Sequence, residues 1–66
     1  GDEKYEALGI PKEWIAVVKK AGYQTVEALK AVGNTNKLHQ ELCGINKKEK
    51  LGLSRLTPEE VKKWLA

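Results

Sequence analysis

Glycine residues divide this chain of 66 residues into short segments. The dividing glycines are Gly9, Gly22, Gly33, Gly44 and Gly52. Between them the apolar residues recur three or four positions apart, as on one face of a helix, and no long stretch alternates like a strand. Because glycine readily takes the left-handed conformation found at helix C-termini, each segment is predicted to be a short helix ended by its glycine. The predicted fold class is all-α: a compact bundle of five or six short helices.

The sequence also predicts where several of the helices start. Pro11 suits the first turn of a helix, where its missing N–H costs nothing, and Thr25 can cap the next helix. The sequence Thr57-Pro58-Glu59-Glu60 combines a cap, a proline and a glutamate at capping-box spacing. Trp14 and Trp64 occupy apolar helical positions, so we expect them to anchor one core from opposite ends of the sequence.

Length and composition limit the kind of protein this is. We expect residues 1–66 to form a single small helical domain, monomeric in isolation, taken from a larger protein. No apolar run approaches the length needed to cross a bilayer, so no membrane partner is expected. Cys43 is the only cysteine. A lone thiol is typical of a reducing compartment, which predicts a cytoplasmic location.

Basic charge is concentrated in the second half of the chain, although the net charge is only +3. In this segment Gly44 is predicted to end one helix and Asn46 to open the next, with Glu49 at capping-box spacing. The cations that follow are Lys47, Lys48, Lys50 and Arg55. A helix start with free N–H groups and several cations suits a phosphate group. The predicted nucleic-acid contacts are therefore Gly44, Asn46, Lys47, Lys48, Lys50 and Arg55.

Two other interpretations of this segment stay open. A short run of lysines is commonly a solvated surface and nothing more. The domain could instead dock onto a protein without touching nucleic acid, and an exposed apolar patch would then be expected.

The remaining chemistry-bearing residues suggest no enzyme. His39 and Cys43 are four residues apart on one helical face, but two ligands do not make a structural zinc site. The same pair lacks the orienting carboxylate that a nucleophile and its base require. We therefore predict no catalytic or metal site, with His39 half-buried or on the surface and Cys43 buried in a hairpin. Tyr5 is the one aromatic residue expected to be partly exposed.

The sequence resembles helix-hairpin-helix modules, including the C-terminal domain of bacterial RNA polymerase alpha subunits. The first hairpin would be residues 20–29, Lys-Ala-Gly-Tyr-Gln-Thr-Val-Glu-Ala-Leu, and the second residues 44–48, Gly-Ile-Asn-Lys-Lys. This resemblance implies a tandem helix-hairpin-helix fold whose backbone N–H groups meet a nucleic-acid phosphate. Asn46 stands where the family usually has its second glycine. Contact with DNA instead of RNA is a variant suggested by this resemblance alone.

A second resemblance covers most of the chain. Four segments look like the extra C-terminal domain of some bacterial class II lysyl-tRNA synthetases. They are residues 38–44, Leu-His-Gln-Glu-Leu-Cys-Gly; residues 46–48, Asn-Lys-Lys; residues 50–53, Lys-Leu-Gly-Leu; and residues 58–64, Pro-Glu-Glu-Val-Lys-Lys-Trp. The resemblance implies an auxiliary domain that aids tRNA binding beside the catalytic domain of its own enzyme. That larger enzyme would use ATP and Mg²⁺ to charge tRNA with lysine. None of the class II catalytic motifs is found here, so this chain itself is predicted to hold no cofactor.

Overall fold

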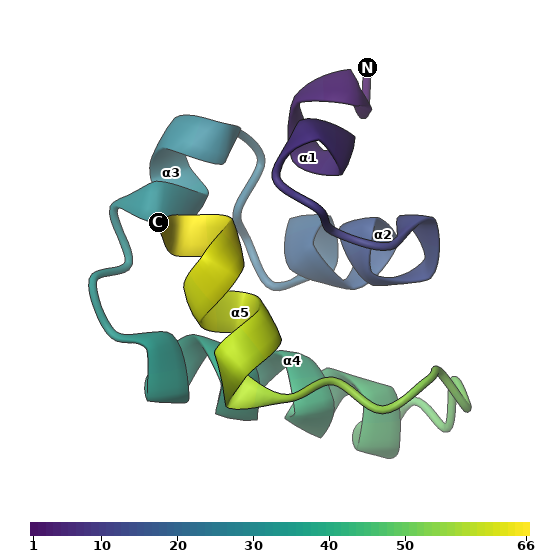
Figure 1. Cartoon of the computed structure of the whole chain (residues 1–66). Helices are drawn as coiled ribbons and strands as arrows, with labels where there is room; N and C mark the ends of the chain where they lie inside the picture. The colour runs from purple at the N-terminus through teal and green to yellow at the C-terminus, as the bar shows by residue number, and fades with distance from the viewer.

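A computed structural model describes all residues, 1–66, as five helices without strands (Figure 1). The helices are α1 (Glu3–Ala7), α2 (Lys12–Lys20), α3 (Val26–Lys30), α4 (Thr35–Lys48) and α5 (Pro58–Leu65). The predicted all-α bundle is confirmed. In Figure 1, α5 crosses over α4, and the segment between them runs back along α4. No helix has the length and apolar character that a membrane crossing requires.

Side-chain caps are present at three of the helices, and two of them, Thr25 and Thr57, were predicted. Thr25 Oγ1 accepts a hydrogen bond from the Ala28 N–H at 3.0 Å. Thr57 and Glu60 form the reciprocal capping box, with Pro58 in the first turn of α5. Asn34, which the sequence analysis did not single out, caps α4 by accepting from the Lys37 N–H at 3.0 Å. Each cap satisfies a backbone donor that has no partner inside its helix.

The core is one cluster of twelve buried apolar residues drawn from every helix. Trp14 and Trp64 belong to it, with 1% and 2% of their surface exposed, so their predicted role is confirmed. The expectation that Tyr5 is partly exposed is wrong: it is 3% exposed. Its hydroxyl donates to the Tyr23 carbonyl oxygen at 2.8 Å, which satisfies the one polar atom of the buried ring.

The turn after α2 ends that helix as the sequence predicts. Gly22 has a φ of +109°, and the N–H of Tyr23 donates to the Val18 carbonyl at 3.2 Å. The N–H of Gly22 itself donates to the Lys19 carbonyl at 3.0 Å. These two bonds define the Schellman motif, which requires a left-handed residue at the position of Gly22. The turn of the first predicted hairpin, residues 20–29, therefore lies at Gly22 between α2 and α3.

The second predicted hairpin is absent, and the prediction that Gly44 ends a helix is wrong. α4 continues through Gly44 to Lys48, and no separate helix spans residues 47–51. The apolar residues Leu38, Leu42 and Ile45 fall at helical spacing across the glycine, and all three pack in or against the core. Glycine inside a helix costs about 1 kcal/mol, which is less than the burial of a leucine contributes. Packing therefore overrides the local stop signal.

Candidate nucleic-acid interface

Three exposed lysines surround the C-terminal end of α4, and a fourth exposed cation, Arg55, lies on the segment that runs back along α4, beside His39. We call these four residues, Lys47, Lys48, Lys50 and Arg55, the basic end. The prediction that these residues follow a helix start is wrong, because Lys47 and Lys48 lie in the last turn of α4. There are consequently no free helical N–H groups here to meet a phosphate.

Because Lys47 and Lys48 lie at the end of a helix and not at its start, their interaction with the helix dipole is favourable. Cations at a helix N-terminus oppose the helix dipole, whereas cations in the last turn stabilise the helix, by about 0.3–1 kcal/mol each. Lys47 and Lys48 thus have a local structural reason for their positions. A bound phosphate is not needed to explain them.

Lys50 ends α4 in the manner of a glycine. Its φ is +53°, the only positive value among the non-glycine residues. The N–H of Leu51 donates to the Asn46 carbonyl at 3.0 Å, and the N–H of Lys50 donates to the Lys47 carbonyl at 3.3 Å. This is the Schellman pattern seen at Gly22, with a lysine in the left-handed position. The side chain at position 50 therefore projects from a sharp turn and not from a helix face.

A fifth cation joins the basic end from a different helix. Lys20, in the last turn of α2, forms an ion pair with Glu49. Glu49 is the only carboxylate between residues 46 and 55. The four cations of the basic end have no carboxylate partner. Sequence reasoning missed Lys20, because nothing in the sequence indicates that residues 20 and 49 meet.

The segment of residues 51–57 is fastened to two helices as it runs back along α4. Asn46 Oδ1 accepts from the Leu53 N–H at 3.1 Å. Ser54 is held from α2, where its carbonyl accepts from Trp14 Nε1 at 3.2 Å and its N–H donates to Glu13 Oε1 at 2.9 Å. The hydrogen bonds from the Ser54 hydroxyl and N–H lower the pKa of Glu13. Asn46 is thus a loop-fastening residue and not the helix cap predicted from the sequence.

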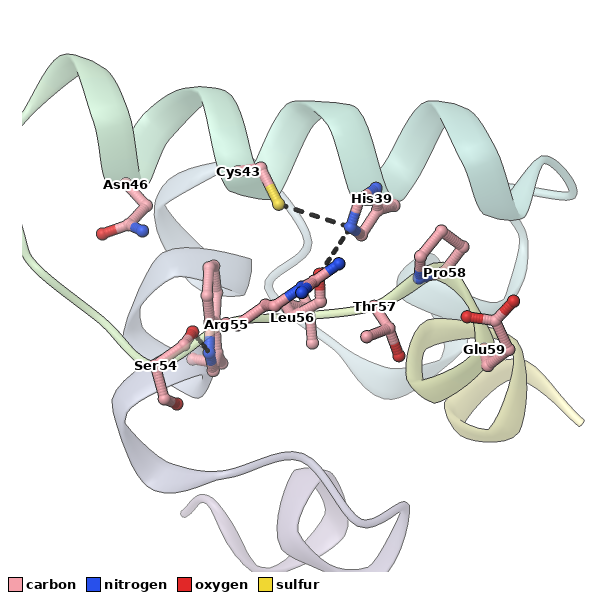
Figure 2. A pocket seen from close by; sticks show the side chains of 10 residues that line it. His39, Cys43, Asn46, Ser54, Arg55, Leu56, Thr57, Pro58 and Glu59 are labelled. Atoms are coloured by element: carbon pink, nitrogen blue, oxygen red, sulfur yellow. Dashed lines mark hydrogen bonds between the residues drawn. The ribbon is translucent and has the colours of Figure 1, made fainter.

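A shallow cavity of about 360 Å³ lies between α4 and this returning segment (Figure 2). Asn46 and Arg55 both line it, together with His39 and Cys43. Gly44 and Lys48 instead line a separate hollow beside α2. The six residues predicted to share one nucleic-acid contact therefore do not all line one hollow.

His39 in this cavity is a tether for the returning segment. Its Nε2 lies 2.7 Å from the Leu56 carbonyl oxygen, as the dashed line in Figure 2 marks. A carbonyl only accepts hydrogen bonds, so Nε2 must carry the proton. The predicted half-buried position of His39 is confirmed.

Cys43 lies 3.4 Å from the same nitrogen of His39. Because Nε2 is protonated, it has no free lone pair with which to take the thiol proton. Burial also raises the pKa of the Cys43 thiol, which keeps the thiol protonated. Cys43 lies in the middle of α4, so its predicted place in a hairpin is wrong. No three side chains of the metal-binding types gather anywhere in the structure.

The fold and this surface define a small all-α domain with a basic end built on one helix terminus. The chain is 47% and 45% identical, over 62 residues, to lysine–tRNA ligases from two strains of Porphyromonas gingivalis. The aligned region is 94% of this chain but 11% of each relative. The resemblance to lysyl-tRNA synthetases is confirmed, and it is a resemblance to a short piece of those enzymes. No family model matches the chain, and no solved structure does.

Proposed function

We propose that this chain is an auxiliary domain of a lysyl-tRNA synthetase, appended at the C-terminus, whose basic end binds tRNA through its phosphates. The catalytic domain of the same enzyme would charge the tRNA with lysine, using ATP and Mg²⁺. The domain itself contributes affinity and orientation and no chemistry. The residues that bind are Lys47, Lys48, Lys50 and Arg55, with Lys20 at their border.

One observation carries the proposal: all four cations of the basic end are exposed and free of carboxylate partners. Glu49, the carboxylate among the lysines, is paired with Lys20. Glu59 lines the same cavity as Arg55 but forms no ion pair with it. A phosphate approaching this surface therefore meets positive charge without first breaking an internal ion pair of the basic end. Arg55 adds a guanidinium group that can hold a phosphate with two hydrogen bonds.

Gly44 and Asn46 have different parts in the proposal from those the sequence suggested. Asn46 supports the interface indirectly, because its side chain fixes the backbone at Leu53, two residues before Arg55. Gly44 is exposed on α4 and lines the hollow that Lys48 also lines. An RNA backbone in that hollow would pass close to the helix, because Gly44 has no side chain.

The second candidate function, docking onto a protein, has less support. Leu51 is the one large apolar residue with an exposed side chain, at 42%. Stable protein interfaces are built around clusters of buried apolar and aromatic side chains. A single exposed leucine does not form the cluster of apolar side chains that such an interface requires.

The proposal is tested by titrating the isotopically labelled chain with unmodified tRNA at low and moderate salt, followed by NMR. Amide shifts centred on residues 46–55 that fade as the salt concentration rises are expected, because phosphate contacts release counterions. The binding variant is Lys47→Glu, Lys48→Glu, Lys50→Glu in one chain. Its tRNA affinity should fall by at least about ten-fold at low salt.

A matched control carries the same change in charge on other surfaces: Lys30→Glu, Lys37→Glu, Lys62→Glu. Lys30 and Lys62 line a different hollow, between the ends of α3 and α5. Circular dichroism checks that both variants remain helical. Equal losses in the two variants would mean that net charge alone attracts RNA, and an unchanged affinity in the first variant would refute the proposed site.

A further inference from the structure

We infer that the RNA bound by the basic end is base-paired: the domain takes the phosphate backbone of a double-stranded stem and not an unpaired loop or single strand. This inference rests on the proposed function and names the class of RNA within it. It follows from how the chain uses its aromatic residues and from the density of charge on the two forms of RNA.

Proteins that bind unpaired RNA stack the bases on exposed aromatic side chains. This chain has two tryptophans, two tyrosines and no phenylalanine. Trp14, Trp64 and Tyr5 are buried in the core, between 1% and 3% exposed. None of these three rings is available to a base.

Tyr23, the remaining tyrosine, is half-buried, and both its hydroxyl and its backbone carbonyl form hydrogen bonds. Its hydroxyl donates to Glu41 Oε1 at 2.8 Å, and its carbonyl accepts from the Tyr5 hydroxyl at 2.8 Å. Desolvation and the Glu41 carboxylate raise the pKa of its hydroxyl, which therefore stays protonated and keeps this bond at neutral pH. The His39 ring, in the cavity beside Arg55, is half-buried and is held by its hydrogen bond to the Leu56 carbonyl. Arg55 is left as the only exposed planar side chain of the basic end, and one guanidinium cannot stack successive bases.

Without stacking, charge density decides which RNA binds better. A DNA duplex carries about one phosphate per 1.7 Å of axis, against about one per 3.4 Å along each of its strands. An RNA duplex likewise carries twice as many phosphates per unit of length as either of its strands. The domain is small, with a longest dimension of 27 Å, so its few cations face a short length of RNA. The same few cations therefore meet more phosphates on a duplex than on an unpaired strand.

The anchored backbone at the basic end favours a rigid partner as well. Lys50 sits in a hydrogen-bonded turn, and Arg55 directly follows Ser54, whose backbone is bonded to Glu13 and Trp14. The backbone positions that carry these two cations are therefore fixed. A rigid stem binds them without paying the ordering entropy that a single strand pays.

The test compares two RNAs in the same buffer: a blunt duplex longer than the domain and an oligouridylate with the same number of nucleotides. We expect the duplex to bind at least about three-fold more tightly, by fluorescence anisotropy, with the steeper salt dependence. Tighter or equal binding of oligouridylate would overturn this inference and leave the proposed function standing. Failure to bind either RNA would overturn both.

A designed variant tests the cause of the preference. Leu51→Trp places a ring beside Lys50 at an exposed position. One stacked base is worth about 1–3 kcal/mol, so oligouridylate should bind at least about five-fold more tightly while duplex affinity changes little. The control is Ala28→Trp, at an exposed position on α3. If Leu51→Trp leaves oligouridylate binding unchanged, the lack of a stacking surface is not what sets the preference.

Discussion

Asn46 holds Leu53 across the end of α4, because its side-chain oxygen accepts the Leu53 N–H at 3.1 Å. The backbone carbonyl of Asn46 accepts from the Leu51 N–H at the same turn. One residue in the last turns of the helix thus fixes two backbone donors of the segment that follows. The position of Arg55 depends on this arrangement.

Asn46→Ala should destabilise the domain by about 1 kcal/mol, because the Leu53 N–H loses its partner. Chemical denaturation measures this loss, and hydrogen exchange at the Leu53 amide should become faster. The control is Asn36→Ala, an exposed asparagine on the same helix whose side chain makes no hydrogen bond. A loss of equal size in the control would show that the Leu53 bond is not the cause.

Gly44→Ala should stabilise the domain by about 0.5–1 kcal/mol, because alanine is the better helix former and the added Cβ meets nothing within 4 Å. Gly22→Ala provides the matched comparison, since its Cβ also has open space. At Gly22, however, φ is +109°, so the substitution should destabilise. Thermal unfolding of both variants measures the contrast. Destabilisation by Gly44→Ala would mean that α4 does not run through this position.

Lys50→Gly should stabilise the fold by up to about 1 kcal/mol, because glycine adopts a positive φ without the steric cost that a lysine pays. The same change removes a cation from the basic end, so tRNA affinity should fall as stability rises. Lys47→Gly is the comparison: it removes a cation inside α4 and should destabilise. Denaturation and tRNA binding measured on the same samples separate the two effects.

Much of this fold was predictable, and the main failure, at Gly44, has its cause in tertiary packing. The caps at Thr25 and Thr57 and the stop at Gly22 follow from local backbone chemistry, and the structure confirms them. Gly44 carries the same local signal as Gly22. Its helix continues because Leu42 and Ile45 on either side are packed against the core, which no local pattern reveals.

For the candidate site, the sequence predicted which charged residues are present but not where the fold places them. The cations of the basic end could be named from the sequence, but their place at a helix end and not a helix start could not. The same limit applies to Lys20, which meets Glu49 only through the packing of α2 beside α4.

Ser54→Ala should raise the pKa of Glu13 part of the way towards its ordinary 4.5, because the hydroxyl donor is lost while the backbone N–H donor stays. A lowered pKa means that the folded chain binds the Glu13 proton more weakly than the unfolded chain does. The resulting stabilisation is present above about pH 4.5 and is lost as the pH falls below it. Ser54→Ala should therefore lose less of its stability on acidification than the parent chain.

The pKa of Glu13 is measured by NMR titration of its carboxyl carbon. Ser54→Thr keeps the hydroxyl and should keep the low pKa. A Glu13 pKa that is the same in Ser54→Ala as in the parent chain would contradict the assigned cause.

The hydrogen bond from Trp14 to the Ser54 carbonyl gives the domain an intrinsic optical reporter. The fluorescence of an indole that donates to a carbonyl differs from that of one that has lost this partner. The Trp14 indole holds the carbonyl of Ser54, the residue directly before Arg55. In a chain carrying Trp64→Phe, Trp14 becomes the only tryptophan, and its emission can be excited selectively over that of Tyr5 and Tyr23. Its emission would then report whether the returning segment stays fastened when RNA arrives, without any dye on the molecule.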